Sequence, residues 1–172
     1  MHEKVFPLIP EEEIQKKVKE LGKRISKDYS GKDLVVIGIL KGSWIFMADL
    51  IREITIPVKC DFLKVSSYVG SKSSGKVNII ADIGLSIERK DVLLIEDIVD
   101  TGITIKSIRD MLLLRKPSSL KICSLLDKPS RRVVEIHPDY IGFEIPDRFV
   151  VGYGLDYNER FRNLRYIGVI GE

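Results

Sequence analysis

An acidic cluster followed by small polar residues stands near the middle of the chain. Glu96 and Asp97 come directly after the apolar run 92–95, and Asp100 follows three residues later. Two adjacent carboxylates repel one another unless a cation or a set of hydroxyl donors offsets their charge, so a bound ligand would relieve the repulsion. Residues 101–104 then supply two threonines and a glycine just before a helical pattern. Because such a turn can present backbone N–H groups to a phosphate, the cluster predicts a ligand site with room for a phosphate.

The strand that precedes the cluster has to position it. The run 92–95 lacks polar alternation, which is typical of a strand that is buried on both faces of a parallel sheet. Ligands of open α/β sheets bind at the C-terminal ends of such strands. Neighbours on a regular strand point to opposite faces, so Glu96 and Asp97 can both serve one ligand only if the strand ends there. In a simpler interpretation, Asp100 or Thr101 caps the helix and the acids are a solvated strand end.

Strands and helices alternate through most of the chain, which predicts a doubly wound α/β fold with its binding loops at one edge of the sheet. A second buried strand, 34–40, ends at the turn Lys41, Gly42, Ser43, and Ser43 can cap the next helix. That helix, 44–53, has a broad apolar face made of Ile45, Ala48, Leu50 and Ile51. The remaining predicted elements are a helix over 10–27, a helix after Thr104, strands over 58–67, 77–81, 120–126 and 166–170, and two short strands within 138–157 joined by a Pro-Asp turn.

Composition limits the class of protein. The chain of 172 residues is the size of one domain, and its 28 basic and 25 acidic residues give a net charge of +3. The charges are mixed along the sequence, so no basic stripe argues for nucleic acid. Without a signal segment or an apolar run of membrane-spanning length, we expect a cytoplasmic protein and no membrane partner. Cys60 and Cys123 lie far apart in apolar segments, which predicts reduced core residues.

Two motifs carry a resemblance to a known family. Residues 96–102 read Glu-Asp-Ile-Val-Asp-Thr-Gly, which closely resembles the phosphoribosyl pyrophosphate signature of the type I phosphoribosyltransferases. The segments 149–153 and 155–159, followed by Phe161 and Arg162, resemble the purine-binding hood of the 6-oxopurine branch of that family. Both motifs occur in the family's order, and the resemblance covers nearly the whole chain, most weakly over about the first thirty residues.

The resemblance implies a fold and a reaction. The fold is that of the type I phosphoribosyltransferases, a mostly parallel sheet flanked by helices, with a small hood formed by terminal segments. A single domain would span 1–172, with the hood contributed by the N-terminal segment and roughly residues 130–172. The reaction is the magnesium-dependent transfer of 5-phosphoribosyl from phosphoribosyl pyrophosphate to hypoxanthine or guanine, which forms IMP or GMP and releases pyrophosphate. The family also implies a homodimer or homotetramer.

Roles for individual residues follow from the resemblance as well. Asp100 would be the acid-base residue beside the purine imidazole ring, and Ser67 and Tyr68 would belong to a catalytic loop that closes over the reacting centre. The phosphoribosyl group would be bound by Glu96, Asp97, Asp100, Thr101, Gly102, Ile103 and Thr104. Pyrophosphate would meet Lys41, Gly42 and Arg162; the purine would meet Lys128, Phe149, Val150 and Asp156; Mg²⁺ would meet Glu96, Asp97 and Asp156. In the family a non-proline cis peptide can occur at the position of Leu40 and Lys41.

Three alternatives stay open at this stage. The first is a regulatory protein of the same fold that binds phosphoribosyl pyrophosphate as a signal and recognises RNA or DNA. The second is a sister phosphoribosyltransferase for adenine or a pyrimidine, against which Lys128 and the segment around Phe149 argue. The third is a plain α/β domain without activity, which would leave the acids and the turn after residue 40 unexplained. The sequence does not decide whether xanthine is a substrate, nor between dimer and tetramer.

Overall fold

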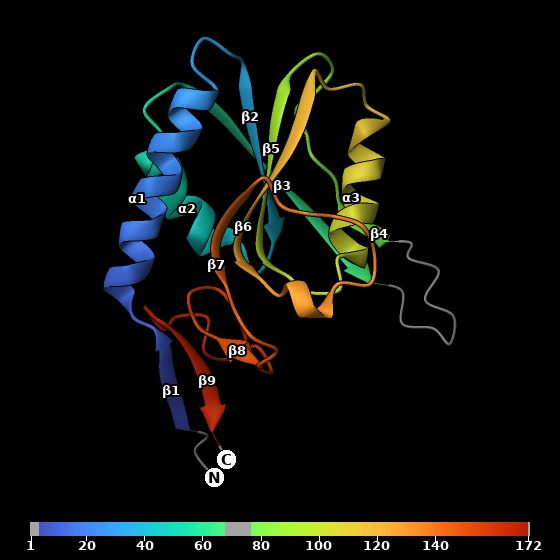
Figure 1. Cartoon of the computed structure of the whole chain (residues 1–172). Coiled ribbons are helices and arrows are strands. Elements are labelled where there is room, and N and C mark those ends of the chain that lie inside the picture. The colour runs from blue at the N-terminus through green and yellow to red at the C-terminus, as the bar shows by residue number, and fades with distance from the viewer. Residues whose placement is uncertain (1–3, 68–76, 172) are drawn as a thin grey trace.

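A mostly parallel six-stranded sheet forms the body of the molecule (Figure 1). The computed structural model describes residues 4–67 and 77–171. The strand order is β4-β3-β2-β5-β6-β7, and β4 alone runs antiparallel to its neighbour. The strands are β2 (Leu34–Leu40), β3 (Val58–Ser67), β4 (Val77–Ala81), β5 (Asp91–Val99), β6 (Ser119–Asp127) and β7 (Tyr140–Glu144). This architecture confirms the predicted fold class.

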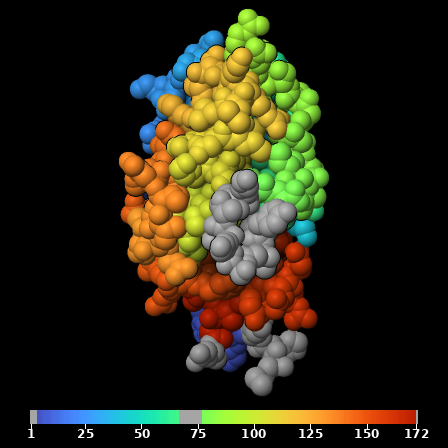
Figure 2. Space-filling model, turned by 90° about the vertical axis from the view of Figure 1, so that its right-hand side faces the viewer, coloured from blue at the N-terminus to red at the C-terminus, as the bar shows by residue number. Residues whose placement is uncertain are grey.

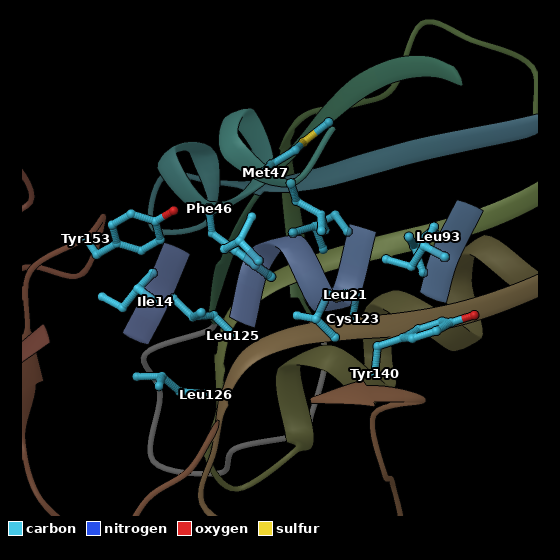
Figure 3. Close-up of a cluster of buried hydrophobic side chains, with 14 of the residues drawn as sticks. Ile14, Leu21, Phe46, Met47, Leu93, Cys123, Leu125, Leu126, Tyr140 and Tyr153 are labelled. Atoms are coloured by element: carbon cyan, nitrogen blue, oxygen red, sulfur yellow. The ribbon is translucent and has the colours of Figure 1, made fainter. Parts of the chain in front are cut away.

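Helices cover both faces of the sheet, and each face has its own core. The helices are α1 (Glu11–Asp28), α2 (Trp44–Glu53), α3 (Ile103–Leu113) and the short 3-10 helix η1 (Pro129–Arg131). Val36 and Leu93 belong to the core under α1 and α2, whose packing Figure 3 shows, whereas Val35 and Leu94 belong to the core on the α3 side. Because alternate residues of a strand point to opposite faces, strands covered on both sides need uninterrupted apolar runs. None of the described helices is long and apolar enough to cross a membrane.

A second, three-stranded sheet forms the hood, in the order β1-β9-β8. It is built from β1 (Lys4–Ile9), β8 (Val150–Val151) and β9 (Ile167–Gly171), so both ends of the chain contribute, as predicted. The hood lies beyond the C-terminal ends of the parallel strands (Figure 1), and a view from the α3 side shows its red segments below the helix (Figure 2). β1 was not predicted, and its Pro7 is tolerated because β1 is an edge strand.

Some local predictions were wrong. The two short strands predicted around the Pro-Asp turn are present, but they belong to different sheets, because β7 pairs with β6 and β8 pairs with β9. Ser43 does not cap α2 with its side chain; its Oγ donates instead to the carbonyl oxygen of Ile39 at 2.6 Å. Cys123 is buried as predicted, but Cys60 is exposed, since it lies on β3 before that strand gains its second partner, β4, at Lys64.

The buried face of α2 also differs from the prediction. Phe46, Met47 and Leu50 are its buried residues, while Ala48 is exposed. Phe46 is fully buried between α2 and the sheet, whereas Phe62 on the nearby strand β3 is 43% exposed. The two phenylalanines therefore form a matched pair for testing where the core lies.

We expect Phe46→Ala to lower the free energy of unfolding by about 3–5 kcal/mol, because it removes a buried ring and leaves a cavity. Phe62→Ala should cost less than about 1 kcal/mol, since most surface changes are small. Urea unfolding of both variants measures the difference. Equal losses would show that α2 does not pack as described.

Candidate active site

Two adjoining cavities lie where β5 and β6 end beneath the hood. The first has a volume of about 230 Å³ and brings together residues from both strand ends and from the hood: Asp97, Ile98, Asp100, Lys128, Phe149, Val150, Leu155 and Asp156. The second, of about 100 Å³, is lined by Glu96, Ile98, Val99, Asp100, Thr101, Gly102, Thr104 and Ile105. Asp100 and Ile98 line both cavities. The structure thus places Asp100 between the residues predicted for the purine and those predicted for the phosphate.

The strand that carries Glu96 and Asp97 continues past them. The sequence had led us to expect that both acids could serve one ligand only if the strand ended there. β5 loses its β2 partner after Ile95, but it pairs with β6 as far as Val99. Glu96 and Asp97 therefore line different cavities, yet their side chains still meet. Burial, the charge of Asp97 and a hydrogen bond between the two carboxyl groups raise the pKa of Glu96 well above its usual value. The described side chains around this pair therefore do not offset all of its negative charge.

The turn before α3 is shaped by Gly102. Its φ is +84°, and a Cβ there would lie 2.6 Å from Ile136 and 2.9 Å from Arg132, so this position requires glycine. Gly102 itself occupies the N-cap position and has no side chain, while the Thr101 hydroxyl accepts a long hydrogen bond from the Ile103 N–H at 3.4 Å. The N-cap position is therefore neither Asp100 nor Thr101, as the simpler interpretation had it, although Thr101 still contacts the first N–H of the helix. The first N–H groups of α3 lack partners within the helix, as at any helix start, and they border the smaller cavity.

A buried ion pair that sequence reasoning missed holds this turn. One Nη of Arg132 donates to the backbone oxygen of Asp100 at 2.6 Å, and the other donates to the carboxylate of Asp127 at the end of β6. The side chains of Arg132 and Asp127 are 10% and 4% exposed. A buried acid at a strand end with an arginine a few residues later was the available signal.

A second missed group of charges surrounds Lys128. This lysine is 8% exposed, and its Nζ lies 3.7 Å from an oxygen of Asp147. The other oxygen of Asp147 is 3.6 Å from Arg131, whose Nε donates to the Asp100 carboxylate at 3.2 Å. A chain of four alternating charges thus connects Lys128 with Asp100. Because Lys128 is buried and its ion pair is long, its ammonium is available to a ligand in the larger cavity.

The turn after β2 approaches both β5 and the hood. The peptide between Leu40 and Lys41 is cis, as the resemblance implied. A Cβ at Gly42 would lie 1.8 Å from the Asp97 carboxylate, and one at Gly154 would lie 2.2 Å from the backbone oxygen of Gly42. Glycine at both positions therefore lets the turn and the hood pack closely beside Asp97.

Charges from the hood face this turn. Lys41 Nζ lies 3.0 Å from the carboxylate of Glu159, a residue that sequence reasoning did not single out. Arg162 contacts Asp156 at 2.9 Å and Glu159 at 3.5 Å, and it donates to the backbone oxygen of Gly154. The Lys41 ammonium, and more weakly Arg162, hold the pKa of Glu159 below its usual value. Lys41 and Arg162 are thus brought together, as expected for residues that share an anion.

The remaining predicted residues are placed less fully. Phe149 is 60% exposed and meets Tyr157 edge-to-face at 5.7 Å between ring centroids, and Val150 pairs with β9. Ile103 begins α3 but lines neither cavity. Ser67 ends β3, but its side chain and all of Tyr68 lie outside the described residues.

A further cavity, of about 370 Å³, lies between α1 and α2 and contains none of the predicted site residues. It is lined by Gln15, Val18, Lys19, Asp49, Arg52, Glu53 and Tyr153. Its size alone does not make it the better candidate, because it lies away from the ends of the parallel strands where ligands of this class of fold bind.

Comparisons with known proteins place the chain in a family. A family model described as a phosphoribosyl transferase domain matches residues 10–158. The hypoxanthine-guanine phosphoribosyltransferase of Staphylococcus aureus (strain Mu50) is 57% identical over 164 residues, which is 95% of this chain and 92% of that protein. A crystal structure of a Staphylococcus aureus hypoxanthine phosphoribosyltransferase matches with a TM-score of 0.94 at 56% identity, covering 96% of this chain and 91% of the other. The structure of a hypoxanthine-guanine phosphoribosyltransferase from Bacillus anthracis matches with a TM-score of 0.94 at 44% identity, covering 99% of this chain and 100% of the other. With both predicted motifs meeting at one site and the family model spanning most of the sequence, the chain belongs to the phosphoribosyltransferase family.

Proposed function

We propose that this protein transfers the 5-phosphoribosyl group of phosphoribosyl pyrophosphate to hypoxanthine or guanine, which forms IMP or GMP and releases pyrophosphate. One observation carries the proposal: Asp100 lies between a cavity with Lys128 and Phe149 and a cavity with the turn 101–104. A base and a phosphate bound there would flank the ribose. The names of the similar proteins, hypoxanthine-guanine phosphoribosyltransferases, support the same reaction.

The phosphate groups would be bound at two places. Backbone N–H groups at Thr101 to Thr104 would hold the 5′-phosphate at the start of α3, where the Ile103 N–H would exchange its 3.4 Å contact with the Thr101 hydroxyl for the phosphate. Lys41, Gly42 and Arg162 would meet the pyrophosphate, since a lysine and an arginine on either side of an anion can offset much of its charge.

The chemical step would take place beside Asp100. The bond from the ribose C1 to the pyrophosphate oxygen breaks as the purine nitrogen bonds to C1, and the proton of that nitrogen passes to the Asp100 carboxylate. Arg131 Nε at 3.2 Å and the Arg132 contact to the Asp100 backbone would keep the carboxylate oriented. Ser67 and Tyr68 would close over the reacting centre and exclude water.

The purine would be recognised by three parts of the larger cavity. Lys128 would leave Asp147 to donate to the 6-oxo group, because lysine has donors and no acceptor. Phe149, largely exposed in the structure, would stack on the ring, and the backbone of Val150 would read its pyrimidine edge.

The acids fit a magnesium ion that arrives with the substrate. Among the described residues, no three His, Cys, Asp or Glu side chains converge as a ready metal site. Mg²⁺ is commonly bound by one or two carboxylates together with substrate phosphates, and Glu96, Asp97 and Asp156 offer such carboxylates. When bound, Mg²⁺ would offset the charge of the leaving pyrophosphate. The crowded charge of Glu96 and Asp97 suits a cation. By the same resemblance, we propose a cytoplasmic homodimer or homotetramer.

One assay tests the proposal as a whole. Pyrophosphate release from phosphoribosyl pyrophosphate is measured with hypoxanthine, guanine, adenine and no base, each with Mg²⁺ and with excess EDTA. Release that requires a 6-oxopurine and is lost in EDTA is expected. Full release in EDTA would contradict the magnesium requirement, and release without a 6-oxopurine would contradict the reaction.

Asp100→Asn should lower kcat by about 10²- to 10⁴-fold, because the amide keeps the shape but cannot accept the proton. Affinity for phosphoribosyl pyrophosphate should change little. Asp110→Asn, on α3 and ion-paired with Lys106, serves as the matched control and should keep the parent rate. Turnover of Asp100→Asn within a few-fold of the parent would remove Asp100 from the chemistry.

Glu96→Gln should stabilise the protein in EDTA by an amount that grows with pH. Folding raises the pKa of Glu96 above the ordinary 4.5, so the ionised form destabilises the native state once the pH exceeds that ordinary value. Glutamine cannot ionise. Parent and variant should unfold at similar urea concentrations below the ordinary pKa of 4.5 and diverge as the pH rises above it. The exposed Glu88→Gln should show no such divergence, and a pH-independent difference for Glu96→Gln would contradict the assignment.

Lys128→Ala should lose the preference for 6-oxopurines. If the ammonium bonds the oxo group, adenine presents a second donor there and leaves a buried charge unpaired, which can reject the wrong base by about 10⁴- to 10⁵-fold in kcat/KM. Steady-state kinetics with hypoxanthine, guanine and adenine on both proteins measures the effect. An unchanged preference in the variant would mean that Lys128 only fills space beside Pro129.

A further inference from the structure

One carboxylate is already ion-paired with both of the cations that the pyrophosphate would need. Glu159 lies 3.0 Å from Lys41 Nζ and 3.5 Å from an Nη of Arg162, and the same carboxylate oxygen makes both contacts. We infer that Glu159 sets the affinity for the pyrophosphate end of the substrate by competing for Lys41 and Arg162 as an internal anion. The inference rests on the proposed function, in which these two cations bind pyrophosphate.

The backbone around Glu159 directs its carboxylate toward the turn after β2. Asn158 and Glu159 have φ of +51° and +62°, in the left-handed region that a glutamate adopts rarely. The turn is closed by reciprocal hydrogen bonds between Tyr157 and Arg160, and the Glu159 N–H donates to Asp156 at 2.9 Å. A disfavoured conformation that surrounding hydrogen bonds maintain is a feature to expect at a functional site.

Distances and exposure decide which acid gives way when the anion binds. Asp156 holds Arg162 at 2.9 Å and its side chain is 31% exposed, whereas Glu159 contacts Arg162 at 3.5 Å and is 67% exposed. In the described part of the chain, Glu159 is the one carboxylate within ion-pair distance of Lys41. An arriving pyrophosphate therefore displaces Glu159, which can turn into water, and leaves the contact between Arg162 and Asp156 in place.

The expected effect is modest because exposed ion pairs are weak. Glu159→Gln keeps the size of the side chain and removes its charge, so it should tighten binding of inorganic pyrophosphate and lower KM for phosphoribosyl pyrophosphate by about two- to fivefold. The kcat should stay within about twofold of the parent, since Glu159 touches no reacting atom of the proposed reaction.

Calorimetric titration with pyrophosphate in the presence of Mg²⁺ and steady-state kinetics test this inference on the full chain. Glu88→Gln is the matched control: it makes the same change in net charge in an exposed loop before β5, at the opposite end of the sheet. In a Lys41→Met background the gain from Glu159→Gln should shrink, because the competition acts partly through Lys41.

The outcomes separate the two proposals. Tighter binding and a lower KM in Glu159→Gln but not in Glu88→Gln support the inference. Unchanged or weaker binding in Glu159→Gln overturns it, since Glu159 would then be inert or a support for Arg162. A parent that binds pyrophosphate but releases none with any base would overturn the proposed function, while the calorimetric difference would still decide the role of Glu159.

Discussion

The buried ion pair between Arg132 and Asp127 is the contact on which the geometry of the site depends. It ties the end of β6 to the backbone of Asp100 on the turn that leaves β5, so two parallel strands end in one connected structure. Removing one partner of a buried pair typically costs about 3–5 kcal/mol, because the other charge is left uncompensated. Gly102 belongs to the same arrangement, since a Cβ at that position would meet Arg132 and Ile136.

The ion pair between Arg132 and Asp127 also affects the two adjacent acids of β5. Glu96 and Asp97 share a hydrogen bond and lie at the border of two cavities. A strand end that is held rigidly cannot relax this repulsion by moving the backbone, so the relief must come from a proton or from a bound cation. The hood completes the site from the other side, where Asp156 and Phe149 face the strand ends. The charge that needs a counter-ion and the enclosure by the hood are therefore both found around Asp100.

Much of the fold could be predicted from sequence because its signals are local. The continuous apolar run of β2 and the spacing within α2 predicted both elements with the observed bounds, since burial on both faces and helical periodicity leave direct marks in the sequence. The acids and the glycine turn could be located as a candidate site because they follow such a strand.

What the sequence did not predict depends on contacts between distant segments. The strand β1 and the separation of β7 from β8 follow from pairing with β9 and β6, and a strand pattern does not name its partner. Arg132 and Asp147 were missed because a charged residue in a loop usually faces water, and only the packed structure shows which cations are enclosed. Glu159 was missed for the same reason: its partner Lys41 lies on the turn after β2.

The proposed site would hold a phosphate, a ribose and a purine in line across Asp100. A crystal structure of the protein with IMP and Mg²⁺ tests it most directly. We expect the 5′-phosphate on the backbone N–H groups of residues 101–104, the base against Phe149, and Lys128 moved from Asp147 to the 6-oxo group. IMP bound in the cavity between α1 and α2, beside Asp49, or IMP with its phosphate away from the turn before α3, would contradict it.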